Sequence, residues 1–328
     1  TSHRRVLEKI PGIGEYTARR IDEGKNEALK RAEKEVSFIE KKNVRLYAIT
    51  EHDYPKRLRA CQDAPVVFYY KGKANLNATK IISIVGTRRA TDYGRMLTER
   101  LVRELAEAYP ALLIVSGLAY GIDICSHRSA LKNGLSTVGV LAHGLDRIYP
   151  AEHRNTAAEM LEQGGLLTDF SSETNPDREN FLKRNRLIAG LSDTTVVVES
   201  AERGGALVTA DIACSYGRDV YAFPGRTTDE CSAGCNRMIQ TNKAGLITSG
   251  QDLIRALCWD TDTTGLSVKG QLKLKLEKPD HPIVKILADR GEMQINDLAM
   301  AINLPVHQVT PILFELELAG HIIALPGG

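Results

Sequence analysis

The sequence lacks the features that mark membrane, disulfide-bonded and zinc-binding proteins. No apolar run approaches the roughly 18 residues needed to cross a bilayer, and no signal peptide is visible. The six cysteines are irregularly spaced, and Cys231 and Cys235, four residues apart, have neither a second pair nor a neighbouring histidine. We therefore expect free thiols, a cytoplasmic location, no membrane insertion and no bound metal.

The sequence also lacks the usual motifs of nucleotide enzymes. It has no Gly-x-x-x-x-Gly-Lys-Ser/Thr, no Gly-x-Gly-x-x-Gly after Val85 and no Gly-x-Ser-x-Gly. Asp123 and His127 have the spacing of an acid–base pair, but an aspartate at a helix start more commonly serves as a cap. No catalytic dyad stands out, so we expect no catalysis and no cofactor.

Charge is spread unevenly along the 328 residues. Residues 1–75 hold 17 Lys and Arg against 11 Asp and Glu, whereas residues 259–328 hold 6 against 9. The formal net charge of +2 therefore hides a basic front and an acidic tail. A polyanion site in the middle of the chain must come from local clustering of cations.

The middle of the chain, residues 76–258, alternates short apolar runs with amphipathic stretches. The clearest helical pattern is 94–109, with Leu97, Leu101 and Leu105 on one face. This alternation predicts an α/β domain with a doubly wound, Rossmann-like parallel sheet, which binds ligands beyond the carboxyl ends of its strands. The predicted strands are 81–85, 112–115, 137–141, 166–168, 195–198, 220–223 and 246–248.

Smaller units flank this domain. Residues 1–75 are predicted to form a helical front and a connector ending in an edge strand over 66–70. Residues 259–280 lack core periodicity and are typical of a linker. Residues 281–328 have the order of a winged helix. Its predicted recognition helix, 306–318, contains no Lys or Arg, which favours packing or partner contact over reading DNA.

The front contains Ile-Pro-Gly-Ile-Gly at 10–14, and helical spacing resumes at Ala18 and Ile21. This resembles the helix-hairpin-helix (SAM-like) family, whose Gly-x-Gly turn offers backbone N–H groups to a DNA phosphate. Many such hairpins serve only as packing modules, and both interpretations stay open.

Unusual residues follow several of the predicted strands. The stretch 112–123 is an apolar strand that breaks at Ser116-Gly117 and turns through Gly121 into a helix, which is typical of an anion cradle and also of an ordinary turn. Glycine pairs and several arginines at the other strand ends suit a chain of phosphates. Tyr149 and His143 are candidates for stacking on unpaired bases. Each arginine alone is more commonly a surface or ion-paired residue, and Glu173 or Glu179 are candidate partners for Arg184 and Arg186.

Residues from about 50 to 258 resemble the DprA (Smf) family of bacterial DNA-processing proteins. The matching motifs include Ile-Val-Gly-Thr-Arg-Arg at 84–89, Ser-Gly-Leu-Ala-Tyr-Gly-Ile-Asp at 116–123 and Gly-Leu-Asp-Arg-Ile-Tyr-Pro at 144–150. They continue in order at 181–190, 204–210, 223–225 and 234–239. Thr91 and Gly205 are mild departures, since serine is more usual there in the family.

The resemblance implies a homodimeric, non-enzymatic protein that binds single-stranded DNA, protects incoming strands during natural transformation and loads the RecA recombinase onto them. Arg88 would be the main phosphate-binding arginine. The residues expected to bind DNA are Arg88, Arg89, Ser116, Gly117, Gly121, Gly144, Arg147, Tyr149, Asn155, Arg184, Asn185, Arg186, Gly204 and Gly205.

Two other functions remain open from the sequence. A nucleoside-monophosphate glycoside hydrolase would also use a Gly-Gly helix start, but its catalytic glutamate shortly after the glycines has no counterpart following Gly205. A structural adaptor would use the hairpin and the winged helix as docking modules.

Overall fold

A computed structural model describes residues 4–260, 281–319 and 321–322. The chain divides into two compact units, Thr1–Thr261 and Asp262–Gly328. The expected linker 259–280 lies almost entirely outside the described residues.

The larger unit is built on one nine-stranded sheet with the strand order β1-β2-β6-β5-β4-β3-β7-β8-β9. Strands β3 to β9 are parallel to one another, whereas β1 and β2 pair in antiparallel fashion. The predicted doubly wound sheet is confirmed, since β3 to β6 progress one way and β7 to β9 the other. The strands are β1 Arg45–Ala48, β2 Val67–Gly72, β3 Ile81–Val85, β4 Leu113–Gly117, β5 Ser136–Val140, β6 Gly165–Thr168, β7 Thr194–Val197, β8 Asp219–Ala222 and β9 Gly245–Leu246.

One strand prediction was wrong in its position. The run at 66–70 was expected at a sheet edge, but β2 pairs on both sides, with β1 and with β6. The edge strand is β1, whose four residues contain only a short apolar signal. The sheet therefore extends back into the region 1–75.

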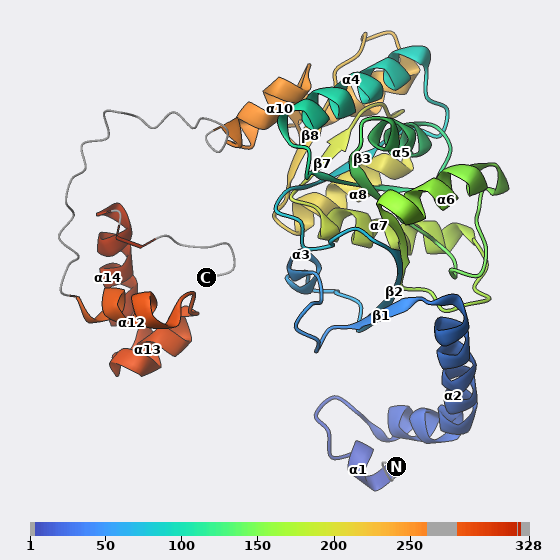
Figure 1. The fold of residues 1–328 in the computed structure, drawn as a ribbon. Coiled ribbons are helices and arrows are strands. Elements are labelled where there is room, and N and C mark those ends of the chain that lie inside the picture. Colours follow the sequence, from blue (N-terminus) through green and yellow to red (C-terminus); the bar gives the residue numbers. More distant parts are fainter. Residues whose placement is uncertain (1–3, 261–280, 320, 323–328) are drawn as a thin grey trace. The chain divides into compact units, whose positions relative to one another are not determined.

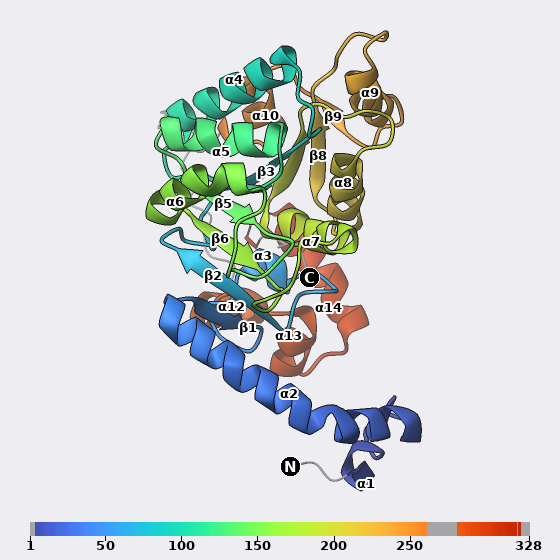
Figure 2. The same cartoon turned by 90° about the vertical axis from the view of Figure 1, so that its right-hand side faces the viewer.

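Helices cover both faces of the sheet, as Figure 2 shows. On one face lie α4 Asp92–Ala108, α5 Ile122–Lys132, α6 Arg154–Gln163 and α10 Gly250–Ala256, and on the other α7 Arg178–Leu191, α8 Gly205–Ser215, α9 Ala233–Gln240 and the short α3 Lys56–Arg59. The predicted face of α4 is confirmed, because Leu97, Leu101 and Leu105 are buried against β3, β4 and β7. Single turns of 3-10 helix occur at Ala151–His153 and Glu230–Ser232.

The front consists of α1 Arg4–Leu7 and the 28-residue α2 Glu15–Lys42. They are joined by a turn in which Gly12 has a positive φ of 88°. Two side chains fix α2 to the loop after β6: Glu35 accepts hydrogen bonds from the backbone and hydroxyl of Ser172, and Arg31 donates to Ser171 at 2.7 Å. The front is thus anchored through the second half of its long helix (Figure 1).

The smaller unit contains α12 Pro282–Arg290, α13 Ile295–Ile302 and α14 Val306–Leu318. Ile283, Leu298 and Val309 form its own small core. Since this core shares no residues with the clusters of the larger unit, each unit is stabilised by its own apolar packing.

Candidate nucleic-acid interface

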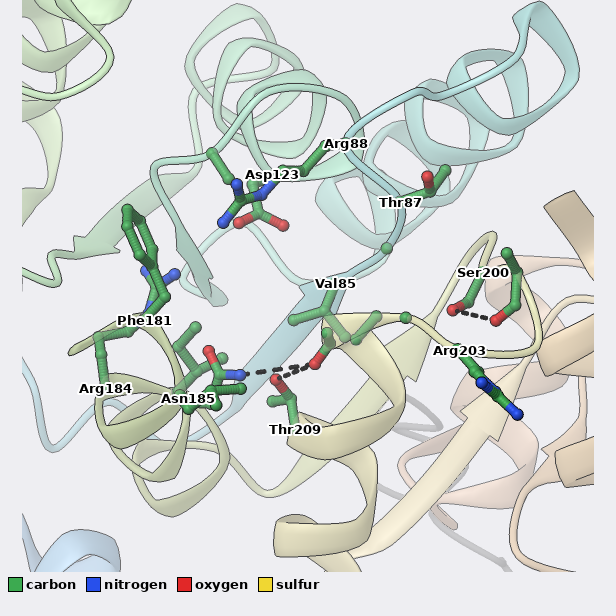
Figure 3. Close-up of a pocket in the computed structure, with 18 of the residues that line it drawn as sticks. Val85, Thr87, Arg88, Asp123, Phe181, Arg184, Asn185, Ser200, Arg203 and Thr209 are labelled. Atoms are coloured by element: carbon green, nitrogen blue, oxygen red, sulfur yellow. Dashed lines mark hydrogen bonds between the residues drawn. The ribbon is translucent and has the colours of Figure 1, made fainter. Parts of the chain in front are cut away.

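A cavity of about 590 Å³ opens where the sheet reverses its direction of progression, beside the carboxyl ends of β3 and β7. Parallel sheets bind ligands at this switch point because the loops from neighbouring strands diverge there to opposite faces. The walls come from the turns after β3, β4 and β7 and from one side of α7 (Figure 3). Four arginines but only one carboxylate, Asp123, line the cavity: Arg88, Arg178, Arg184 and Arg203.

Arg88 lies on the turn between β3 and α4. This turn is held to the turn after β7, since the Thr87 amide donates to the Glu199 carbonyl at 2.7 Å. The buried Glu199 carboxylate also accepts from the backbone and hydroxyl of Thr91, the N-cap of α4. Two loops distant in sequence are therefore locked together, and the exposed Arg88 side chain projects from a rigid base.

Phe181 on α7 joins three of the surrounding side chains. The Arg88 guanidinium lies 4.9 Å from the centre of its ring and that of Arg184 lies 6.0 Å away. The Tyr149 ring is 6.1 Å from it in a tilted arrangement. Figure 3 shows the Arg88 guanidinium beside the Asp123 carboxylate, with Phe181 across from them. The cavity thus combines cations with an aromatic face, the two elements that grip a single strand.

Arg184 and Asp123 are both buried and lie near one another beside the cavity. Burial lowers the pKa of Arg184 to about 10, although the nearby Asp123 opposes this shift. Burial also raises the pKa of Asp123, against the opposing influence of Arg184 and the Ala119 amide. Arg184 donates to the Val140 carbonyl, while its Nε has no protein partner. One buried donor of Arg184 is therefore left without a protein partner.

Gly117 makes this close pairing possible. Any Cβ at that position would overlap with the Arg184 guanidinium and the Asp123 carboxylate. Gly121, with a φ of 78°, has no room for a side chain either, because a Cβ would overlap with the Thr87 carbonyl. The glycines of the predicted turn therefore serve close packing between loops as well as backbone freedom.

The start of α8 contributes backbone groups. Its N-cap, Gly204, is extended and makes no side-chain cap, so the first N–H groups of α8 have no such partner. The site of a Cβ on Gly205 faces open space, whereas a Cβ on Gly204 would overlap with Ser200. The Gly205 carbonyl accepts from Asn185 at 3.5 Å and from Thr209 at 3.4 Å. The positive end of a helix dipole thus adds to the arginines.

The structure brings five of the expected residues into the cavity: Arg88, Arg184, Asn185, Gly204 and Gly205. Gly117 and Gly121 do not line the cavity, but each packs against a residue that does, Gly117 against Arg184 and Gly121 against the Arg88 backbone. The buried Ser116 donates to the Ile84 carbonyl at 2.6 Å. Tyr149 does not line the cavity itself, but its ring lies beside that of Phe181, which does.

The other expected residues are placed outside the cavity. Arg147 donates to Asp146 and Asn175, and Gly144 packs against the loop at Ser171 and Ser172. Arg186 binds Asp169 and the Asp63 carbonyl, so its partner is neither Glu173 nor Glu179. Asn155 lies at the exposed start of α6, and Arg89 lines a neighbouring groove.

The predicted role of His143 was wrong. We expected its ring as a base-stacking platform, but it is 1% exposed and its Nδ1 lies 2.8 Å from the Gly144 carbonyl. Burial lowers its pKa. Because the ring is buried, it has no exposed face on which a base could stack.

Three residues that line the cavity were not expected from the sequence: Phe181, Arg178 and Arg203. Phe181 precedes Arg184 by three residues, so both lie on the same side of α7. This helical spacing was available in the sequence and identifies Phe181 as a neighbour of the cavity.

Fold and site define a Rossmann-like α/β protein with a cationic, aromatic-lined cavity at the switch point of its sheet. The chain belongs to the DNA recombination-mediator protein A (DprA) family, whose model matches residues 45–258, and a DprA winged-helix model matches residues 270–328. The resemblance inferred from the motifs is confirmed, and so is the winged-helix class of the smaller unit. The family consists of DNA-processing, recombination-mediating proteins.

Individual relatives agree with this assignment. Protein Smf of Escherichia coli is 35% identical over 309 residues, covering 91% of this chain and 80% of the relative. The crystal structure of DprA from Streptococcus pneumoniae has a TM-score of 0.61 at 36% identity and covers 64% of this chain and 73% of its own. DNA processing protein A from Helicobacter pylori, whose structure concerns its single-stranded-DNA binding mode, has a TM-score of 0.59 at 29% identity, covering 66% and 96%.

Among the residues that the structure describes, no three or more His, Cys, Asp or Glu side chains gather as a metal site. Over the same part of the chain, none of the helices is both long and apolar enough to pass through a bilayer.

Proposed function

We propose that this chain binds single-stranded DNA in the cavity at the β3–β7 switch point, protects it, and delivers it to a RecA recombinase during transformation or recombination. The observation that carries the proposal is the set of four arginines that line the cavity beside a single carboxylate, Asp123, with the guanidinium groups of Arg88 and Arg184 over the Phe181 ring. Phosphates suit the arginines and the start of α8, and a base suits the ring. The relative from Helicobacter pylori, which binds single-stranded DNA, supports it.

The proposed role is binding without catalysis. Asp123 is the only carboxylate among the residues that line the cavity, and these include no histidine, cysteine or lysine to form a catalytic pair with it. The glycoside-hydrolase alternative requires a glutamate shortly after the glycines, and the first turn of α8 has no acidic residue. Release of free adenine from AMP by the purified protein would favour the enzyme instead.

The decisive test is titration of fluorescent oligothymidine at two salt concentrations with wild type and Arg88→Ala. Loss of a charge-assisted contact predicts about a tenfold or larger fall in affinity. It also predicts a salt slope smaller by about 0.7, since one phosphate contact is lost. Arg255→Ala on α10, which removes an exposed arginine paired with Asp252, is the matched control and should bind as wild type does. Equal binding by Arg88→Ala and wild type would refute the site.

The aromatic contact has its own variant pair. Phe181→Leu should weaken binding by about fivefold to a hundredfold through lost stacking, whereas Phe181→Tyr should retain it. Light scattering, which measures self-association, tests the proposed homodimer. The proposed delivery of DNA is tested by asking whether RecA displaces a single-strand-binding protein from DNA to which this chain is bound.

A further inference from the structure

A second concave surface shares Arg88 with the cavity. It is a groove between α4 and α5, and Arg88 lines both. Its walls carry six exposed cations against two carboxylates, Glu99 and Glu152. The cations are Arg88, Arg89, Arg95, Arg103, Arg128 and Lys132.

Most of these cations have no carboxylate partner. Within residues 4–260 of the described structure, Arg95 is the only one of the six in an ion pair, at 3.7 Å from the exposed Asp92. Arg128 donates instead to the Thr156 hydroxyl at 3.3 Å. Elsewhere in this unit exposed cations commonly have partners, such as Lys73 with Glu162 and Lys243 with Asp211. Like charges that repel one another across a groove are the usual arrangement for a polyanion.

The spacing of the cations follows the helices. Arg95 and Arg103 are eight residues apart on α4, which corresponds to about 12 Å along one side. Arg128 and Lys132 are one turn apart on α5. Both helices follow parallel strands and pack side by side, so they run away from the carboxyl edge of the sheet together. The two rows therefore lead away from Arg88 and Arg89.

One aromatic side chain stands at the entrance of this groove. Tyr120 is 44% exposed, and its ring is held edge-on by His153 at 4.9 Å. Its hydroxyl donates to Glu152 at 2.9 Å, which also engages one of the two carboxylates. An exposed ring with a fixed orientation is suited to stack on a base.

We infer that the α4–α5 groove binds the next stretch of the same single strand, with phosphates along Arg95, Arg103, Arg128 and Lys132 and a base on Tyr120. Resting on the proposed function, this inference assigns a longer path to the DNA: the strand leaves the cavity across Arg88 and Arg89 and continues between the two helices. Continuity through Arg88, which belongs to both surfaces, favours a nucleic-acid strand over a separate acidic protein.

The test separates the groove from the cavity by oligomer length. Wild type and Arg103→Gln/Lys132→Gln are titrated with oligothymidines of about 4 and about 16 nucleotides at two salt concentrations. The variant should bind the long oligomer about tenfold more weakly, with a salt slope smaller by about 1.4 for two lost phosphate contacts. It should bind the short oligomer, which the cavity alone accommodates, as wild type does.

Lys73→Gln/Lys243→Gln removes the same net charge from exposed, ion-paired sites and should bind both oligomers as wild type does. Unchanged binding of the long oligomer by the groove variant would overturn the inference. An equal loss for both lengths would also overturn it, since that result indicates a general field effect. If wild type binds neither oligomer, the proposed function itself fails. If wild type binds both oligomers and Arg88→Ala weakens that binding, the proposed function stands, whatever the groove variant shows.

Discussion

At the residue scale, His127 supports the site without facing it. The ring is fully buried, with Nε2 2.8 Å from the Gly117 carbonyl and Nδ1 2.7 Å from the Thr137 hydroxyl. Because a carbonyl only accepts, the neutral ring donates from Nε2 and accepts at Nδ1. Burial lowers its pKa to about 4. The imidazole therefore fixes the Gly117 peptide, against which Asp123 and Arg184 pack.

This pKa predicts a pH dependence of stability. The unfolded chain takes up a proton near pH 6.5 and the folded chain only near pH 4, so the stabilisation is present above about pH 6.5 and is lost as the pH falls toward 4. The loss amounts to about 3 kcal/mol of unfolding free energy. Urea unfolding of wild type and His127→Gln between pH 7 and 4 measures it, with the exposed His52→Gln as control. Parallel curves for wild type and His127→Gln would contradict the prediction.

At the scale of elements, the site depends on contact between two turns. The turn from β4 into α5 touches the turn from β3 into α4, where the Ile122 amide donates to the Thr87 carbonyl at 3.2 Å. Gly121 lies at this contact with a positive φ. Gly134, at the far end of α5, also has a positive φ of 75° but has open space around it.

These two glycines form a matched pair of variants. Gly134→Ala should cost only backbone strain, about 1–2 kcal/mol, and leave DNA affinity unchanged. Gly121→Ala should cost a further 1–3 kcal/mol, roughly, from overlap with Thr87, and weaken oligothymidine binding because it displaces Arg88. Chemical denaturation and the same DNA titration measure both effects. Equal affinity losses for the two variants would show that the turn contact does not position Arg88.

At the scale of the whole molecule, two units with separate cores divide the chain. Both cationic surfaces belong to the larger unit. In the smaller unit, α14 has no Lys or Arg, while Phe314 is 62% exposed. An apolar side chain without neighbouring cations suits contact with a protein more than contact with phosphates.

We therefore expect that a chain ending at residue 260 binds oligothymidine within about twofold of the full-length protein, since both cationic surfaces belong to the larger unit. Fluorescence titration of both proteins under the same salt conditions tests this. A loss of tenfold or more would assign DNA contact to the winged-helix unit.

The sequence by itself determined the architecture of the large domain. Short apolar runs alternating with helical patterns such as 94–109 predict buried parallel strands, because only strands covered on both faces are apolar throughout. Motifs in a fixed order, such as those at 84–89 and 116–123, are enough to identify the family. The sheet edge was misjudged, since the pairing of β1 with β2 joins strands separated by a long connection and leaves little local signal.

Only the tertiary structure decided which side chains share a site. Arg184 and Arg186 are two residues apart on α7, yet one faces the cavity and the other binds Asp169, because a helix turns roughly 200° over two residues. His143 followed a strand end, as the cavity residues do, and was buried by its own loop. Arg88 lines both the cavity and the α4–α5 groove, a position set by the packing of α4 against α5 and by the turn at Gly121, which no spacing in the sequence expresses.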